Sequence, residues 1–329
     1  MKKILVTGGA GYIGSKIVAD LIKEKYKVYI IDNLSTGHKF LINKKASFIR
    51  ININNKKKLN NYLKKHKITS VIHCAASLDV NESEKKPRKY YINNFINTKK
   101  LLEVCIKNNL KNFIFSSTCA VYGNVFGKVK ENLVPRPVSI YGKTKLQCEK
   151  IIQSYSKKYN FNYGILRYFN VAGSDMINKI GCINKNNQLI KNISSSVANN
   201  KNEVFIYGDN YKTRDGTCIR DYIHLEDISK IHCKLLSIIS EKNTSYLLNC
   251  GYGAGYSVLE IINNFEKFFR IKLKKFFLPK RKGDIVQIIS STEKIKKLLK
   301  IKLNKKNKLK KIIISSVRWE KYLNRNYYI

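Results

Sequence analysis

The chain has 329 residues, 43% of them hydrophobic, which is enough to bury a substantial core and exceeds the size at which chains commonly divide into domains. It begins with a charged pair, Lys2 and Lys3, and no apolar stretch reaches the roughly 20 residues that cross a bilayer. Eight cysteines are scattered without a CxxC pair or neighbouring histidines at metal-ligand spacing. We therefore expect a cytoplasmic protein with free thiols, no membrane span and no metal.

The formal net charge is +42, from 64 lysines and arginines against 22 aspartates and glutamates. Such an excess can mark a surface that binds polyanions. Here it is mostly lysine, spread along the chain beside abundant asparagine and isoleucine, which are residues that an AT-rich coding sequence favours. No RNA-binding aromatic motif or DNA-binding module accompanies it. We therefore expect no nucleic-acid partner, and a selected polyanion-binding surface is the open alternative.

Short apolar runs alternate with longer amphipathic segments through the first half of the chain, which is the pattern of a parallel sheet with helices on both faces. The helical candidates have apolar residues at helical spacing and cover 13–25, 87–108 and 141–159. The six expected strands cover 4–7, 28–31, 47–51, 70–73, 112–117 and 163–168. The pattern predicts an α/β fold with a doubly wound parallel sheet of Rossmann type.

The alternation of strands and helices breaks after Asn170. Stretches rich in glycine and asparagine, short strands and a lysine-rich tail follow it. This change predicts a dinucleotide-binding domain over 1–170 and a smaller, C-terminal substrate domain over 171–329. Some later segments are expected to return to the first domain.

A glycine loop, Gly8-Gly9-Ala10-Gly11-Tyr12-Ile13-Gly14, follows the first expected strand and opens the first expected helix. Glycines let the backbone approach a pyrophosphate, whose charge the helix N-terminus stabilises. Asp32 ends the second expected strand, where a carboxylate accepts hydrogen bonds from the adenosine ribose and repels a 2′-phosphate. Together they predict a site for NAD in preference to NADP. Ordinary turn chemistry is the alternative for each motif alone.

Tyr141 and Lys145 stand four residues apart on an expected helix, so they share a face. A nearby ammonium and a cationic nicotinamide ring favour the phenolate, and lowering the pKa of Tyr141 by about three units corresponds to roughly 4 kcal/mol. Tyr141 is then a usable proton acceptor. The preceding strand ends in Phe115-Ser116-Ser117-Thr118, which presents a hydroxyl toward the same site. The pair alone is a weak signal because the chain has 21 tyrosines.

Seven segments carry a resemblance to a known family. They read TGGAGYIGS, IDNLSTG, FIFSSTCAVYG, YGKTK, RYFNVAGSD, DGTCIRDYIH and NCGYGAGYSVLEII. From the first residues to about Asp284, they resemble the extended short-chain dehydrogenase/reductases, and among these the UDP-glucose 4-epimerases. The resemblance implies an isomerase of galactose metabolism that interconverts UDP-galactose and UDP-glucose. It also implies a retained NAD⁺ that takes a hydride from sugar carbon 4 and returns it to the opposite face.

The same resemblance implies roles for individual residues. Tyr141 would remove the proton of the carbon-4 hydroxyl, Lys145 would hold the nicotinamide ribose and lower the pKa of Tyr141, and Thr118 would bond the reacting oxygen. Further cofactor contacts are implied for Gly8, Gly11, Tyr12, Ile13, Gly14, Asp32, Asn33, Asn52, Ile53, Asn93 and Phe169. Substrate contacts are implied for Asn170, Arg220 and Arg281 at the diphosphate, Asp284 near the ribose, and Gln188, Leu189 and Tyr207 around the uridine.

Chemistry supports the arginines, because a guanidinium binds a pyrophosphate bidentately and a lysine does so poorly. The alternative for Arg220 is a surface ion pair with Asp221. Three positions depart from the family pattern. Asn52 and Ser290 stand where aspartates are common, and Ile288 leaves the acceptance of N-acetylated sugars undecided.

Other functions remain as alternatives, and one is another nucleotide-sugar epimerase of the same family. A nucleotide-sugar dehydratase begins with the same oxidation but needs an acid and a base after the active-site threonine, where this chain has Cys119 and Ala120; a decarboxylase is a further relative. Outside enzymes, an NAD-bound basic protein could bind nucleic acid. We expect His73, His224, Cys119 and Cys250 to serve packing or polar support. The resemblance also implies a homodimer through the helices over 87–108 and 141–159.

Overall fold

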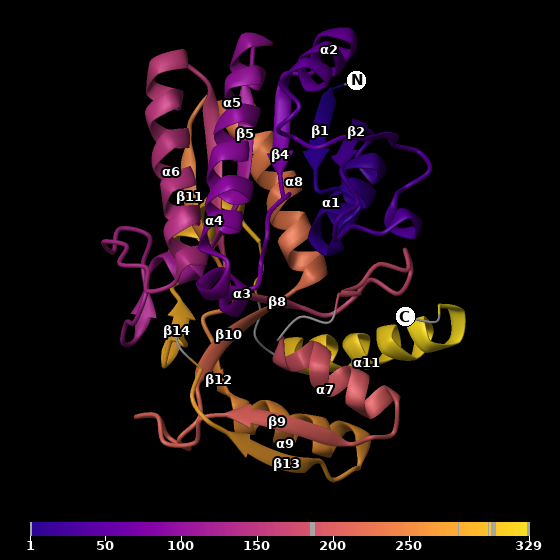
Figure 1. The fold of residues 1–329 in the computed structure, drawn as a ribbon, viewed down its shortest axis with the longest axis vertical. Coiled ribbons are helices and arrows are strands. Elements are labelled where there is room, and N and C mark those ends of the chain that lie inside the picture. The colour runs from indigo at the N-terminus through magenta and orange to yellow at the C-terminus, as the bar shows by residue number, and fades with distance from the viewer. Residues whose placement is uncertain (1, 185–187, 282, 302, 304–306, 328–329) are drawn as a thin grey trace. The chain divides into compact units, whose positions relative to one another are not determined.

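The computed structural model describes residues 2–184, 188–281, 283–301, 303 and 307–327. The chain forms two compact units, each assembled from segments that are far apart in the sequence (Figure 1). Unit 1 contains Met1–Val121, Pro137–Arg167 and Ile228–Leu248. Unit 2 contains Tyr122–Arg136, Tyr168–Asp227 and Asn249–Ile329.

Unit 1 is built on a seven-stranded sheet in the order β11-β7-β5-β4-β1-β2-β3. Its strands are β1 (Lys3–Thr7), β2 (Lys27–Asp32), β3 (Ser47–Arg50), β4 (Ser70–His73), β5 (Asn112–Thr118), β7 (Asn162–Tyr168) and β11 (Tyr246–Cys250). The pairings from β5 to β3 are parallel, and β1 and β4 lie in the middle, buried on both faces. The predicted doubly wound α/β fold is confirmed. The predicted number of six strands is wrong, because β11 comes from beyond the point where the alternation breaks.

Helical segments separate most of the strands of unit 1 along the chain. They are α1 (Tyr12–Lys23), η1 (Lys39–Leu41), α2 (Lys56–His66), α3 (Val80–Lys85), α4 (Pro87–Tyr90), η2 (Tyr91–Ile96), α5 (Asn97–Lys107), η3 (Cys119–Val121), α6 (Ile140–Tyr159) and most of α8 (Leu225–Lys242). The expected single helix over 87–108 is helical throughout, but η2 is a π-helical segment. Such segments occur often at functional sites.

Unit 2 contains two smaller sheets. One has five strands, β6 (Lys128–Val129), β8 (Asn170–Ala172), β10 (Ile219–His224), β12 (Gly255–Ser257) and β14 (Gln287–Ser290), and the other pairs β9 (Glu203–Tyr207) with β13 (Lys274–Leu278). Its helices are α7 (Leu189–Ala198), α9 (Val258–Phe269), α10 (Glu293–Leu299) and α11 (Lys308–Asn326). Helix α9 begins with a capping box in which Ser257 and Glu260 satisfy each other's backbone N–H groups.

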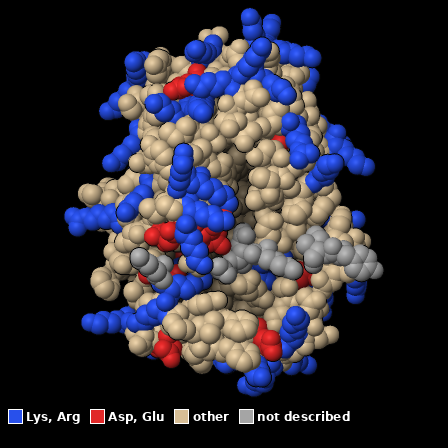
Figure 2. Space-filling view, viewed as in Figure 1, with Lys and Arg blue, Asp and Glu red and all other residues tan. Residues whose placement is uncertain are grey.

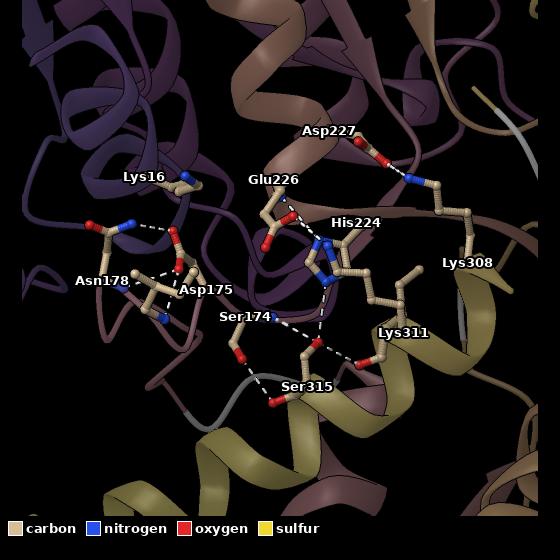
Figure 3. A network of polar contacts seen from close by, with 12 residues as sticks. Lys16, Ser174, Asp175, Asn178, His224, Glu226, Asp227, Lys308, Lys311 and Ser315 are labelled. Carbon is tan, nitrogen blue, oxygen red and sulfur yellow. Dashed lines mark hydrogen bonds and ion pairs between the residues drawn. The ribbon is translucent and has the colours of Figure 1, made fainter. Parts of the chain in front are cut away.

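The C-terminal helix α11 is tied into unit 2 by the polar network of Figure 3. The Ser315 hydroxyl lies 3.2 Å from His224 Nε2, and Lys308 Nζ donates to Asp227 Oδ2 at 2.7 Å (Figure 3). A side chain at Gly173, whose φ is +91°, would meet the His224 ring at 2.7 Å. Helix α11 is therefore an integral part of unit 2, and His224 serves this packing.

Lys and Arg side chains are spread over the face of the molecule shown in Figure 2 and do not gather in one patch. Within the described part of the chain, no helix is long and apolar enough to span a membrane. The same residues hold no group of three or more His, Cys, Asp or Glu side chains placed to bind a metal ion.

Candidate active site

The glycine loop joins β1 to α1 in unit 1, and two of its glycines are required by the fold. Gly8 has a φ of +72°, and a Cβ there would lie 2.7 Å from the backbone nitrogen of Ala75. A Cβ at Gly14 would lie 2.2 Å from the Gly8 carbonyl oxygen. At Gly11 a Cβ would meet only that oxygen, at 3.2 Å, and no side chain caps the helix there. The helix N-terminus is therefore open beside Gly11, which fits a bound phosphate.

Asp32 lies at the end of β2, next to this loop, and its side chain is buried. Its carboxylate accepts hydrogen bonds from the backbone N–H of Ala10 at 3.1 Å and of Leu34 at 2.8 Å. A Cβ at Gly37 would lie 2.9 Å from Asp32 Oδ1, so the glycine leaves room for the carboxylate. The residues present thus fit a dinucleotide, because an acidic group at this place in a Rossmann sheet meets the adenosine ribose.

The other residues expected near the cofactor have local partners. The side-chain oxygens of Asn33 and Asn52 accept from the backbone N–H two residues on, as in Asx turns. Asn93, in the π-helical segment η2, donates from Nδ2 to Ser77 Oγ at 2.9 Å. Ile53 packs in the core of unit 1. These contacts position the loops but do not test a cofactor contact.

Tyr141, Lys145 and Thr118 are all buried in unit 1, where the structure brings them together. The Thr118 hydroxyl acts on the pKa of the Tyr141 phenol. Lys145 Nζ donates to the backbone carbonyl of Ser116 at 2.8 Å and lies 4.8 Å from the centre of the Phe115 ring. The end of β5 thus carries a partner for each residue of the Tyr-x-x-x-Lys pair.

The pKa of Tyr141 reflects the burial of its side chain. Burial raises the pKa of Tyr141 above its ordinary value, and the hydrogen bond from Thr118 lowers it by less. Burial also lowers the pKa of Lys145. That Lys145 and a bound nicotinamide together lower the pKa of Tyr141 stays a prediction, because burial is the largest influence in the protein alone.

The start of α6 is fixed by residues that sequence reasoning missed. The Tyr141 backbone N–H donates to Ser83 Oγ at 3.1 Å, and the Ile140 N–H donates to Glu84 Oε1 at 2.8 Å. Both acceptors come from α3, which lies more than fifty residues earlier in the chain. No local sequence pattern predicts these two contacts. They cap the free N–H groups of the helix and so hold Tyr141 in place.

His73 and Cys74 are buried or half-buried near the end of β4, and neither has the properties of a nucleophile or base. His73 lies between Thr7 Oγ1 at 2.6 Å and Thr98 Oγ1 at 2.8 Å, and burial lowers its pKa to about 3. Burial raises the pKa of the Cys74 thiol to about 11. His73 is therefore a neutral packing residue, as expected.

Unit 2 brings three of the expected substrate residues together. Arg281 donates from Nε to Asp284 Oδ2 at 2.9 Å and from Nη2 to Oδ1 at 3.2 Å. Its guanidinium carbon lies 4.6 Å from the centre of the Tyr207 ring. A planar cation stacked on an aromatic ring and held by a carboxylate is preorganised to bind phosphate.

Arg220 belongs to the same part of unit 2. Its Nη1 donates to the Ile219 carbonyl at 3.0 Å, and both Arg220 and Asp284 act on the pKa of the Cys218 thiol. Among the described residues, Arg220 and Asp221 do not form the ion pair that was the alternative for Arg220. Asp221 is fully buried and accepts from Tyr252 N at 3.0 Å and from the Ser290 hydroxyl at 2.7 Å. The bond from Ser290 accounts for a serine at this position, because its hydroxyl can donate to the buried Asp221 carboxylate.

The remaining expected substrate residues lie at the ends of elements of unit 2. Asn170 is exposed at the start of β8, and Gln188 and Leu189 stand at the N-terminus of α7. Phe169 is buried and donates its N–H to the Cys250 carbonyl at 3.1 Å. Ile288 is also buried and lies beside Arg220 in the parallel pair of β10 and β14.

Residues 4–251 match the model of the NAD dependent epimerase/dehydratase family. The chain belongs to this family. It is 37% identical over 322 residues to a UDP-glucose 4-epimerase of Lactobacillus helveticus, with 97% of each chain covered. The structure of a UDP-glucose 4-epimerase from Stenotrophomonas maltophila, with bound NAD and formylated UDP-arabinopyranose, is similar with a TM-score of 0.92, 30% identity and 99% of each chain covered. That of a Brucella ovis UDP-glucose 4-epimerase in complex with NAD has a TM-score of 0.91 at 32% identity, covering 98% of this chain and 99% of that one.

The match to the NAD dependent epimerase/dehydratase family includes the glycine loop, the Tyr141, Lys145 and Thr118 group, and Arg220. It ends before Arg281 and Asp284. The relatives cover that region too, because their alignments extend over nearly the whole chain.

Proposed function

We propose that the protein is an NAD-dependent UDP-glucose 4-epimerase that interconverts UDP-galactose and UDP-glucose. The observation that carries the proposal is the group of Tyr141, Thr118 and Lys145, which are all buried in the unit that contains the glycine loop. Relatives named UDP-glucose 4-epimerase share about a third of their residues with this chain along almost its full length. Unit 1 is then the NAD-binding domain and unit 2 the nucleotide-sugar domain.

Residues of unit 1 would hold the cofactor. The open helix N-terminus at Gly11 would receive the pyrophosphate, Asp32 the adenosine ribose and Lys145 the nicotinamide ribose. When bound, NAD supplies an acceptor for the hydride of sugar carbon 4, which later gives the hydride back, and it also supplies a positive charge that favours ionisation of Tyr141. The two glycines fixed by the fold, Gly8 and Gly14, keep the loop close to the sheet.

Tyr141 moves the proton of the reaction. Its phenolate oxygen takes the proton of the substrate's carbon-4 hydroxyl, and the Thr118 hydroxyl bonds the same oxygen. Since burial raises the pKa of Tyr141, its phenolate is a stronger base for this step, and the resulting phenol gives the proton back to the same oxygen when the sugar is reduced on its other face. One residue thus acts as base and then as acid, which an epimerase requires because the reaction is symmetrical.

Unit 2 would hold the UDP group. Arg281 and Arg220 would bind the diphosphate, with Tyr207, Gln188 and Leu189 near the uridine. The dehydratase alternative lacks its acid and base, since the residues after Thr118 are Cys119 and Ala120. The Ala120 N–H instead donates to Thr118 Oγ1 at 3.1 Å. The geometry therefore supports the oxidation and reduction of the sugar without elimination.

We further propose a cytoplasmic homodimer that pairs through α4, η2, α5 and α6. Tyr91, Ile92 and Tyr159 support it, because these large apolar side chains on the expected helices are 42%, 43% and 43% exposed. Light scattering of the purified protein checks the mass, and a monomer of 38.1 kDa would contradict the dimer.

The experiment that tests the activity uses the purified protein with UDP-galactose and no added NAD. The proposal predicts that UDP-glucose forms, because the cofactor is retained through purification. No conversion by a sample shown to contain NAD would refute it. The same assay with UDP-N-acetylgalactosamine determines whether Ile288 leaves room for an N-acetyl group.

A further inference from the structure

Three buried polar side chains join helix α6 to the sheet of unit 1. Glu149 is 1% exposed, Arg167 3% and Ser117 2%. Arg167 binds the Glu149 carboxylate through two parallel hydrogen bonds, from Nε to Oε1 at 3.0 Å and from Nη2 to Oε2 at 2.6 Å. The Ser117 hydroxyl donates to the same Oε1. We refer to Glu149, Arg167 and Ser117 as the clamp.

The clamp lies next to the candidate catalytic residues. Glu149 follows Lys145 by four residues and Tyr141 by eight, and all three are on the buried side of α6. Ser117 directly precedes Thr118 at the end of β5, and Arg167 stands on the neighbouring strand β7. The clamp therefore connects the helix that carries Tyr141 to the strand that carries Thr118.

A buried ion pair resists sliding more strongly than apolar packing does. Any displacement of α6 along β5 would separate Glu149 from Arg167 and leave an unpaired charge away from water. Apolar contacts have no such directional requirement. The action of Thr118 on Tyr141 depends on how closely their two hydroxyls approach each other, so it depends on this register.

The Glu149 carboxylate also acts on the site electrostatically. It raises the pKa of Lys145, against the lowering that burial produces. The clamp thus supports the charged form of the ammonium that donates to the Ser116 carbonyl.

We propose that Glu149 is a positioning residue for the reaction. With Ser117 and Arg167 it fixes the register of α6 against β5, so that the hydroxyls of Tyr141 and Thr118 meet at one substrate oxygen. The inference rests on the proposed function, because its first readout is epimerase turnover.

The test compares Ser117→Ala, which removes one bond of the clamp, with Ser156→Ala as a matched control. Ser156 lies on α6, the helix that carries Glu149. Its hydroxyl donates to the backbone carbonyl of Phe161, near the C-terminal end of the helix and far from Tyr141. In Ser117→Ala, kcat should fall about tenfold while KM for UDP-galactose changes less than about twofold, since misplaced catalytic groups lower the rate more than binding. Ser156→Ala should keep both constants.

A second readout is independent of activity. Amide hydrogen exchange over residues 140–149 should become faster in Ser117→Ala and in Glu149→Gln, and should stay unchanged in Ser156→Ala. Unchanged kcat and exchange in Ser117→Ala would refute the clamp, even if Glu149→Gln does not fold. A wild type with bound NAD but no epimerase activity would refute the proposed function alone, and the exchange rates would still decide for or against the clamp.

Discussion

Tyr141 and Thr118 are linked electrostatically: burial raises the pKa of Tyr141, and the Thr118 hydroxyl acts as a hydrogen-bond partner that lowers it by less. Thr118 ends β5 and Tyr141 lies in the first turn of α6. Thr118 therefore favours the phenolate that the proposed reaction needs.

Replacing Thr118 by alanine removes that favourable bond. The rate of epimerisation rises with pH as Tyr141 ionises, so a higher pKa moves this rise to higher pH. We expect a shift of about one pH unit and a fall in kcat at pH 7 of about tenfold or more. The pH profile of kcat measures both. Thr118→Ser keeps the hydroxyl and should keep the profile, and an unshifted profile in Thr118→Ala would show that the bond does not tune Tyr141.

Retention of NAD should depend on Asp32. In Asp32→Ala the bonds to the Ala10 and Leu34 N–H groups are lost together with the carboxylate for the ribose, so less NAD should copurify. The nucleotide released on denaturation, per mole of protein, measures this. Asp20→Ala is the control, because Asp20 pairs with Lys16 on the body of α1. Equal NAD content in Asp32→Ala and wild type would contradict the assignment.

Arg281 should matter for substrate binding and little for the chemical step. We expect Arg281→Ala to raise KM for UDP-galactose by about 10- to 100-fold, the usual effect of losing a charge-assisted bond to phosphate. The control is Arg214→Ala, which removes an arginine of unit 2 that pairs with the partly exposed Glu260. Steady-state kinetics separate KM from kcat. A loss of kcat at constant KM in Arg281→Ala would assign the residue to a different role.

Two buried histidines of unit 1 should make the protein sensitive to acid. Burial lowers the pKa of His73 to about 3 and that of His232 to about 4, from 6.5 in the unfolded chain. Between these values the unfolded state binds more protons, so stability is full above pH 6.5 and falls as the pH drops toward 4. Each histidine contributes about 1 kcal/mol per pH unit to the slope.

Urea unfolding at several pH values measures this slope. His232→Gln removes one contribution and should make the dependence shallower between pH 6.5 and 4. A free energy of unfolding that is the same at pH 7 and pH 5 would contradict the buried, neutral state of both histidines.

Local patterns predicted most of unit 1. Strand β4 has the expected bounds, and the expected catalytic group assembles because Thr118 ends a strand and Tyr141 opens the next long helix. The sheet brings such ends together, so spacing along the chain was sufficient. The seventh strand, β11, was not predicted as part of this sheet, because a short apolar segment far along the chain does not indicate which sheet it joins.

What spacing could not predict depends on burial and on long-range partners. The direction in which the pKa of Tyr141 moves follows from desolvation, which no sequence motif measures. The contacts of Ser83 and Glu84 with the start of α6, and of Arg167 with Glu149, join segments that only the folded chain brings together. The π-helical segment η2 was not predicted, because it is a short interruption within a longer helical stretch and too brief to change the apolar pattern.

The central claim is that sugar carbon 4 is oxidised and reduced by a cofactor that stays bound. It is tested most directly with UDP-galactose carrying deuterium at carbon 4, incubated in ordinary water without added NAD, and with the UDP-glucose product analysed by mass spectrometry and NMR. The account predicts that the deuterium is retained at carbon 4, because the hydride never leaves the site. Product in which hydrogen from the solvent replaces the deuterium would contradict it.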